Sequence, residues 1–190
     1  MAPERPRPRD RVLAAASRLF YEHGVRAVGV DRVAAESGVG KMSLYRHFPS
    51  KDHLVVAVLE MRDGPALAAI EAMADAVSGS PKQRLQGVFD ALEQAVGNPA
   101  WHGCAFANTA LELHDADHPA RQVAERHKAR TVAFFERLAG DGGAERPHDL
   151  AEQLTVLLDG AMVAVQVRAD PAAARPAAQA ARTLISAHLP

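Results

Sequence analysis

The chain has 190 residues, of which 48% are hydrophobic and 24% are charged, so it can bury a substantial core. The formal net charge is −1, which by itself gives no reason to expect a nucleic-acid partner. Its single cysteine excludes an intrachain disulfide, and no apolar run reaches the length of a membrane span. The N-terminus carries arginines without an apolar segment behind them, unlike a secretory signal, so a soluble cytoplasmic protein is expected.

Charge is unevenly distributed along the chain. Residues 1–50 carry nine Lys and Arg against five Asp and Glu, whereas residues 51–190 carry thirteen against eighteen. Only the first segment has the positive balance that phosphate groups attract. Residues 1–9 alternate proline with arginine and are not expected to be helical. They are either an irregular tail or a basic arm that contacts DNA beside the main site.

Three helices are predicted in the first fifty residues. The first covers Asp10 to His23, where apolar residues follow a 3.6-residue period, and Gly24 ends it. Val30, Val33 and Ala34 share one face of the second helix. After it, two glycines flank Val39 and permit a sharp turn into a third helix, Lys41 to Phe48. Leu44 and Phe48 lie on one face of this third helix and are expected to be core, while its hydrogen-bond donors occupy the other faces. This pattern predicts a helix-turn-helix.

The run AESGVGKMSLYRHFPSKDHL resembles the DNA-binding signature of the tetracycline-repressor (TetR) family of bacterial transcription regulators, and VLAAASRLFYEHGVRAVGVDRVA resembles the preceding part of that domain. An all-α fold of about nine helices is therefore expected. It would comprise a three-helix DNA-binding head in residues 1–50 and a larger helical ligand-binding and dimerisation domain in residues 51–190. The resemblance also implies a homodimer on a palindromic operator, controlled by a small-molecule effector and usually acting as a repressor.

The third helix provides the predicted DNA contacts. A helix in the major groove presents only three or four side chains to base edges. By resemblance, Met42 and Ser43 lie where family members approach bases, whereas Tyr45, His47 and Lys51 more often bind phosphates. Family members usually have threonine before the second helix, as its cap and a phosphate contact, but Gly29 stands here. Any replacement contact must come from backbone N–H groups. The complete predicted set is Gly29, Lys41, Met42, Ser43, Tyr45, Arg46, His47 and Lys51.

A long helix is predicted from Ser50 to about Val77, with Ser50 as its cap. Gly64-Pro65 lies in its middle and should kink it, because proline removes one backbone hydrogen bond. In the resembled family this helix links head and body, so the kink is either a hinge or a static bend. Further helices are expected from Ser80 to Val96, in the segment after Asn98, and from Ala120 to Leu138. Two more follow, one opened by Pro147 and one from Pro171 to Leu189.

The resemblance implies an effector pocket in the body. Apolar walls with a few polar groups suit a small molecule, although the same side chains could equally be ordinary core. The predicted lining is Trp101, Cys104, Phe106, Asn108, Leu111, Phe134, Met162 and Gln166.

The last two helices carry more apolar surface than one monomer core would accommodate, and the helix from Leu150 to Val167 is apolar nearly all round. They are expected to form an isologous dimer interface as a four-helix bundle, as in the resembled family. The predicted interface residues are Leu154, Leu158, Met162, Val165, Ala177, Ala180 and Leu184.

Other readings have less support. Glu112, His114, Asp115, Asp117 and His118 could bind a divalent metal, but the same segment resembles a polar turn that caps the next helix. Neither a metal nor a cofactor is therefore predicted. No catalytic motif stands out, and Cys104 is expected to be a structural thiol, so the chain is not expected to be an enzyme. The alternative to a regulator is a small-molecule binding or carrier protein that retains the helix-turn-helix as scaffold.

Overall fold

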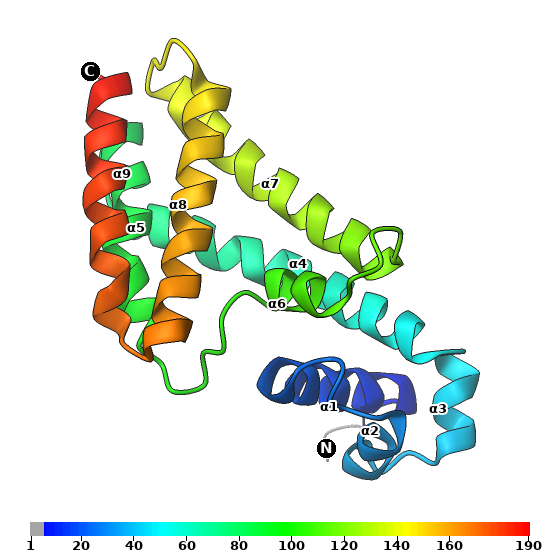
Figure 1. Ribbon diagram of the computed structural model, residues 1–190. Helices are drawn as coiled ribbons and strands as arrows, with labels where there is room; N and C mark the ends of the chain where they lie inside the picture. The colour runs from blue at the N-terminus through cyan, green and yellow to red at the C-terminus, as the bar shows by residue number, and fades with distance from the viewer. Residues whose placement is uncertain (1–5) are drawn as a thin grey trace, which may run out of the picture. The chain divides into compact units, whose positions relative to one another are not determined.

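The computed structural model describes residues 6–190, which form helices and connecting loops without any strand (Figure 1). The described part contains nine α-helices and one short 3₁₀ helix, so the predicted all-α class is confirmed. The elements are α1 (Pro8–His23), α2 (Val30–Ser37), α3 (Lys41–His47), α4 (Lys51–Asp75), α5 (Pro81–Val96), α6 (Ala105–Glu112), α7 (Pro119–Asp141), α8 (Pro147–Arg168), η1 (Pro171–Ala174) and α9 (Arg175–His188).

Helix starts follow from local chemistry. Pro8, Pro81 and Pro147 each begin a helix, where the missing N–H of proline costs nothing. Ser80 caps α5 by accepting from Gln83 N, and the Gln83 side chain accepts from Ser80 N, which is a capping box. Because Pro8 is the first residue of α1, the non-helical prediction for residues 1–9 is wrong from Pro8 onward; residues 1–5 lie outside the described part.

The predicted last helix is interrupted. The chain forms the 3₁₀ turn η1 over Pro171–Ala174 before α9 begins at Arg175. Asp170 caps this turn through its carboxylate, which accepts from Ala172 N. Pro176, in the first turn of α9, has no N–H to continue a helix from the preceding residues, so the single predicted helix becomes two.

Two compact units make up the chain, and each combines segments that are distant in the sequence. Unit 1 consists of Met1–Asp63 and Ala105–Glu125, and unit 2 of Gly64–Cys104 and Arg126–Pro190. The predicted boundary at residue 50 therefore differs from the division in the structure. Helix α4 contributes its first half to unit 1, and its division falls beside Pro65, through which the helix continues. Whether Gly64-Pro65 acts as a hinge stays a prediction.

Unit 1 has a small apolar core shared by the head helices and α4. Val12, Leu19, Val33, Leu44 and Leu54 are all buried in it. A polar contact reinforces the packing of α4 on α1. Arg62 Nε donates to Ser17 Oγ (2.8 Å), Arg62 Nη2 donates to Ser17 O (3.1 Å), and the guanidinium lies 4.3 Å from the Tyr21 ring centroid. Burial lowers the pKa of Arg62, and Tyr21 opposes this shift.

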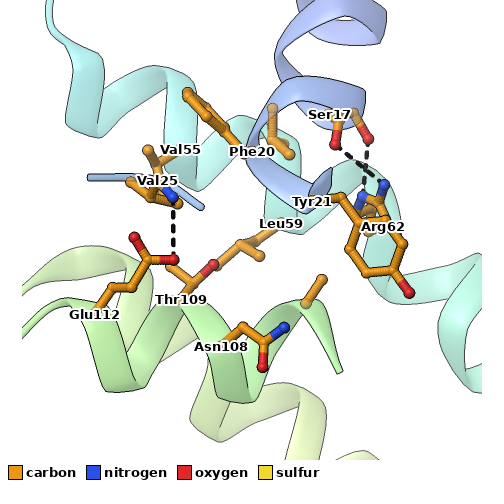
Figure 2. A pocket seen from close by; sticks show the side chains of 12 residues that line it. Ser17, Phe20, Tyr21, Val25, Val55, Leu59, Arg62, Asn108, Thr109 and Glu112 are labelled. Atoms are coloured by element: carbon orange, nitrogen blue, oxygen red, sulfur yellow. Dashed lines mark hydrogen bonds between the residues drawn. The ribbon is translucent and has the colours of Figure 1, made fainter. Parts of the chain in front are cut away.

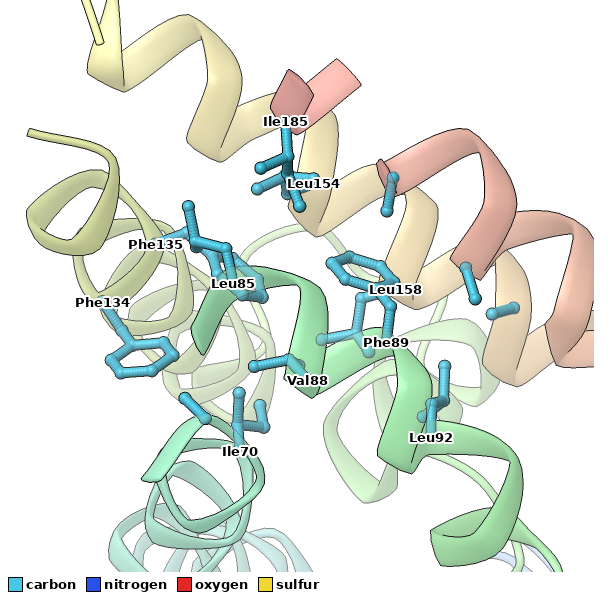
Figure 3. Packing of buried hydrophobic residues seen from close by; sticks show 14 of the residues in the cluster. Ile70, Leu85, Val88, Phe89, Leu92, Phe134, Phe135, Leu154, Leu158 and Ile185 are labelled. Atoms are coloured by element: carbon cyan, nitrogen blue, oxygen red, sulfur yellow. The ribbon is translucent and has the colours of Figure 1, made fainter. Parts of the chain in front are cut away.

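Unit 2 is built around α5, whose buried face packs against α7, α8 and α9 (Figure 3). Phe89 and Phe135 stack with ring centroids 6.1 Å apart, and Phe134 lies 5.5 Å from Phe135. Gly87 allows the segment that follows α4 to approach α5 closely, because a Cβ there would lie 2.4 Å from Val77 Cγ2. This core is larger than that of unit 1.

Helix α8 uses much of its apolar surface inside unit 2. Leu154, Leu158 and Val165, expected at a dimer interface, are instead buried in the core of their own unit. Met162, Ala177 and Leu184 are partly buried against the same core, and Ala180 is half-buried. An all-apolar helix does not reveal from its sequence which face points inward, which explains this correction.

Helix α8 is also the one helix of the described residues that is long and apolar enough to cross a membrane. Of an 18-residue apolar stretch of this helix, 39% is buried within the structure. By length and composition, the prediction that no apolar run reaches the length of a membrane span is therefore wrong. One face of α8 packs against α5 and α9, whereas Val156, Val163 and Val167 on the other face are exposed.

Replacing Leu158 by alanine should lower the free energy of unfolding by about 2–5 kcal/mol, because it leaves a cavity in the core of unit 2. Urea denaturation at fixed protein concentration measures the change. Leu111→Ala removes the same atoms from a side chain that is 70% exposed and should change the free energy by less than about 0.5 kcal/mol. Equal losses in the two variants would contradict the assigned core.

Candidate nucleic-acid interface

The turn between α2 and α3 has the geometry of a helix-turn-helix corner. Gly38 follows the last residue of α2 in the left-handed conformation, with φ 61° and ψ 29°. Gly38 N donates to Ala35 O (3.2 Å) and Val39 N donates to Ala34 O (3.2 Å), the two bonds of a Schellman motif. Val39 is buried, and α3 starts immediately after Gly40. The direction of α3 is therefore set by how α2 ends.

Arg11 of α1 reinforces this corner from outside the motif. Its Nη2 donates to the carbonyl oxygens of Ser37 (2.6 Å) and Gly38 (2.9 Å), the unpaired acceptors at the end of α2. A Cβ on Gly38 would lie 2.6 Å from this nitrogen, so Gly38 is needed for its backbone conformation and for the approach of Arg11. No motif in the sequence around Arg11 indicates this role.

Helix α3 has a buried and an exposed face. Leu44 and Phe48 are buried, as predicted, and the Arg9 guanidinium lies 5.4 Å from the Phe48 ring centroid. On the other side Met42 is 89% and Tyr45 40% exposed, and Arg46 is also exposed, with Nη2 donating to Ser43 Oγ (3.1 Å). The exposed face therefore combines a thioether, a phenol, a guanidinium and a hydroxyl.

Lys41 at the start of α3 is paired with an acidic residue of α2. Its Nζ lies 2.6 Å from Asp31 Oδ1, and both side chains are largely exposed. The hydrogen bond from Lys41 to Asp31, and the charge of Asp31, raise the pKa of Lys41. Lys41 remains charged at neutral pH, but in the absence of DNA its charge is balanced by a neighbour. Asp31 is thus a determinant of this face that the list of predicted DNA contacts omits.

The ends of the neighbouring helices complete the surface. Gly29 precedes α2 with extended backbone (φ −80°, ψ 155°) and offers no capping side chain, and a Cβ there would meet nothing within 4 Å. The predicted absence of a side-chain cap is thus confirmed. Ser50 Oγ accepts from His53 N (3.2 Å) and so caps α4, as predicted. Lys51 and His47 are half-buried.

Two known protein families match different parts of the chain. The family described as "Bacterial regulatory proteins, tetR family" matches residues 12–58, and "Tetracyclin repressor-like, C-terminal domain" matches residues 81–181. The second match alone spans more than half of the chain. The chain belongs to the TetR family.

Curated relatives of this TetR-family chain are transcription regulators. The activator FasR of Mycolicibacterium smegmatis is 30% identical over 138 residues, 72% of this chain and 61% of that protein. The regulator LmrA of Bacillus subtilis is 30% identical over 166 residues, 82% of this chain and 84% of that protein. The chain thus spans less than two thirds of FasR but most of LmrA.

Solved structures agree over nearly the whole length. A protein of Streptomyces avermitilis assigned to the TetR regulators is 37% identical, with a TM-score of 0.84, covering 96% of this chain and 98% of that one. A TetR-family regulator of Streptomyces coelicolor is 28% identical, with a TM-score of 0.85 and 95% coverage of both chains. The chain is therefore a transcriptional regulator of the TetR type with a DNA-binding helix-turn-helix.

The predicted effector-binding residues of this TetR-family chain are divided between the two units. Phe106, Asn108 and Leu111 belong to unit 1, where Phe106 is buried and Leu111 largely exposed. In unit 2, Phe134 is core, Trp101 and Met162 are partly buried against that core, and Cys104 is half-buried. Gln166 Nε2 donates to His102 O (2.8 Å). The effector site stays a prediction.

The acidic and histidine segment after α6 has structural roles. Glu112 accepts from two backbone N–H groups, and Asp115 Oδ1 accepts from Asp117 N (3.0 Å). His118 Nδ1 accepts from Ala120 N (3.1 Å) at the start of α7, and its Nε2 lies 3.4 Å from Asp52 Oδ1. Among the described residues, no three such side chains are arranged to hold a metal ion.

Asp31→Asn should increase the affinity of the TetR-family chain for DNA by about threefold or more at low salt, because it removes a negative charge beside the DNA-reading helix and frees Lys41. Fluorescence anisotropy with a labelled duplex measures the change. Lys41→Ala should then cost more affinity in the Asp31→Asn background than in the wild type. As the control, Glu36→Gln removes an exposed carboxylate that pairs with Arg18 and not with Lys41. An equal gain in DNA affinity in this variant would show that the change in net charge, and not the release of Lys41, causes the effect.

Proposed function

We propose that the protein is a ligand-responsive repressor that binds a palindromic operator as a homodimer and is released by a small-molecule effector. It would act in the cytoplasm. The observation that carries the proposal is the exposed face of α3, held on a rigid corner in the one segment of the chain with a positive charge balance.

The chemistry of α3 suits base and phosphate contacts. Arginine and lysine donate to the acceptor edge of guanine, serine to either partner, and a methionine side chain can contact the thymine methyl group. We assign Met42, Ser43 and Arg46 to base edges. Tyr45, His47, Lys51 and the N–H groups at the start of α2, next to Gly29, are assigned to phosphates. Because Lys41 pairs with Asp31, it must break this ion pair before it can contact DNA.

The proposed dimer uses the outer faces of α8 and α9. Val156, Gly160, Val163 and Val167 follow one another at helical spacing on α8, and the three valines are 68%, 47% and 80% exposed. A Cβ at Gly160 would meet nothing within 4 Å, so a second helix could approach closely there. Two copies of α8 and α9 would form a four-helix bundle. Ala177, Ala180 and Leu184, half-buried on α9, retain some surface for this contact.

Release by an effector requires two states of the dimer. The ligand must bind more tightly to the state whose heads do not match the spacing of the operator half-sites. The sign of regulation differs among relatives, since FasR is named an activator and KstR2 of Mycolicibacterium smegmatis, 32% identical over 119 residues, a repressor. A reporter gene behind the bound operator would therefore decide it. Repression predicts higher expression when the protein is deleted.

The wild-type protein should bind DNA from upstream of its own gene with nanomolar affinity that falls steeply with salt, because phosphate contacts release counterions. Arg46→Ala should weaken binding by about tenfold or more. Anisotropy titrations at several salt concentrations measure both effects.

Arg168→Ala is the matched control, since it removes an exposed arginine at the end of α8 and should leave the affinity unchanged. If the protein does not bind the upstream DNA, duplexes that it does bind are selected from a pool of random sequences. If that selection enriches nothing, the regulator proposal fails, and the helix-turn-helix serves as scaffold in a small-molecule binding protein.

Val163→Asp should convert the dimer to a monomer, because it places a charge in the apolar stripe of α8. Sedimentation equilibrium should give about twice the chain mass of 20.3 kDa for the wild type and the chain mass for the variant. Ala68→Asp adds the same charge to an exposed position of α4 and should remain dimeric. A dimeric Val163→Asp protein would rule out this interface.

A further inference from the structure

Two backbone amides after α1 bind a carboxylate from α6. Glu112 Oε1 accepts from Val25 N at 3.1 Å (Figure 2). Glu112 Oε2 accepts from Arg26 N at 2.7 Å. All three residues belong to unit 1. Consecutive N–H groups that point to one side form a concave site for an anion. Here the side chain of Glu112, 86 residues further along the chain, occupies that site.

Gly24 makes this contact possible. It ends α1 with φ 85°, a conformation that favours glycine, and it turns the next two N–H groups toward α6. A Cβ at this position would lie 2.8 Å from Glu112 Oε1 and 3.1 Å from Oε2. The missing side chain therefore leaves the space that the carboxylate fills.

Glu112 occupies an electrostatically unfavourable position in its own helix. It is the last residue of α6 and the only charged one, and a negative charge at a helix C-terminus opposes the helix dipole. Arg121 of α7 compensates, because its Nη1 donates to Ala110 O (2.7 Å) and Leu113 O (3.1 Å) at the same end. Stability of α6 alone would not favour a glutamate here, whereas the contact to the α1–α2 turn does.

Six apolar and six polar side chains from α1, the turn after it, α4 and α6 line a cavity of about 20 Å³, enough for a water-sized molecule (Figure 2). Arg62 and Ser17, at the far side of this cavity, connect α4 to α1. Glu112 connects α6 to the segment that leads into α2.

We propose that Glu112 is a positioning residue for DNA binding. By binding the N–H groups of Val25 and Arg26, it holds the turn that ends at Gly29. This turn sets the start of α2, and α2 in turn orients α3. The inference rests on the proposed DNA-binding function.

The test compares Glu112→Gln and Glu112→Ala with wild type in the operator-binding assay. Glutamine preserves the size of the side chain but offers one amide oxygen to two N–H donors, and its own NH₂ opposes one of them. Both variants should therefore lose DNA affinity by about tenfold, as expected for a bond to a charged acceptor. A packing role predicts instead that Glu112→Gln binds like wild type. Glu125→Gln, which neutralises an exposed carboxylate on α7, is the matched control and should change nothing.

Amide hydrogen exchange supplies a second measurement that does not depend on DNA. Val25 and Arg26 should exchange slowly in the wild type and at least tenfold faster in Glu112→Gln. Gly24→Ala should have the same effect while leaving the carboxylate intact, and combining the two substitutions should add little. Unchanged exchange at both amides, or wild-type DNA affinity in Glu112→Gln, would overturn the inference. If the two amides exchange as predicted in wild type and variants, but neither the wild type nor any variant binds DNA, the contact is real and the proposed function is refuted.

Discussion

The DNA-reading surface depends on how α2 ends. The left-handed backbone at Gly38 allows the two Schellman hydrogen bonds, and Arg11 binds the carbonyl groups that these bonds leave open. A residue other than glycine would cost about 1–2 kcal/mol for the backbone alone and would also displace the guanidinium. Since α3 has only seven residues, its orientation is inherited from this corner and from the burial of Leu44 and Phe48.

Three short helices bury too little surface to be stable by themselves. Later parts of the chain supply the missing buried surface, because unit 1 also includes the first half of α4 and all of α6. These segments contact the head through hydrogen bonds as well as apolar packing. Arg62 of α4 donates to Ser17 of α1, and Glu112 of α6 accepts from the turn after α1. The segments that stabilise the head are thus the same segments that continue toward the body of the protein.

Charge is used differently on the two parts of the molecule. In the head, arginine and lysine outnumber carboxylates, and Asp31 balances Lys41 when no DNA is bound. Unit 2 carries ten Lys and Arg against eleven Asp and Glu. Several of them form surface pairs, such as Arg175 with Glu93, whose hydrogen bond lowers the pKa of Glu93 and raises that of Arg175. Exposed pairs of this kind contribute little stability.

The sequence by itself determined the all-helical class, the helix-turn-helix, the inner residues Leu44 and Phe48 and the cap at Ser50. These features follow from short-range periodicity and from the local chemistry of glycine and serine, which a linear pattern preserves. Tertiary structure alone decided which face of α8 is core, because an all-apolar helix has no periodic signal that distinguishes its faces, and Leu154 and Leu158 were consequently assigned to the wrong surface. It also decided the roles of Arg11 and Glu112. Their partners are backbone groups 26 and 86 residues away, and a backbone carbonyl or N–H leaves no trace in a sequence.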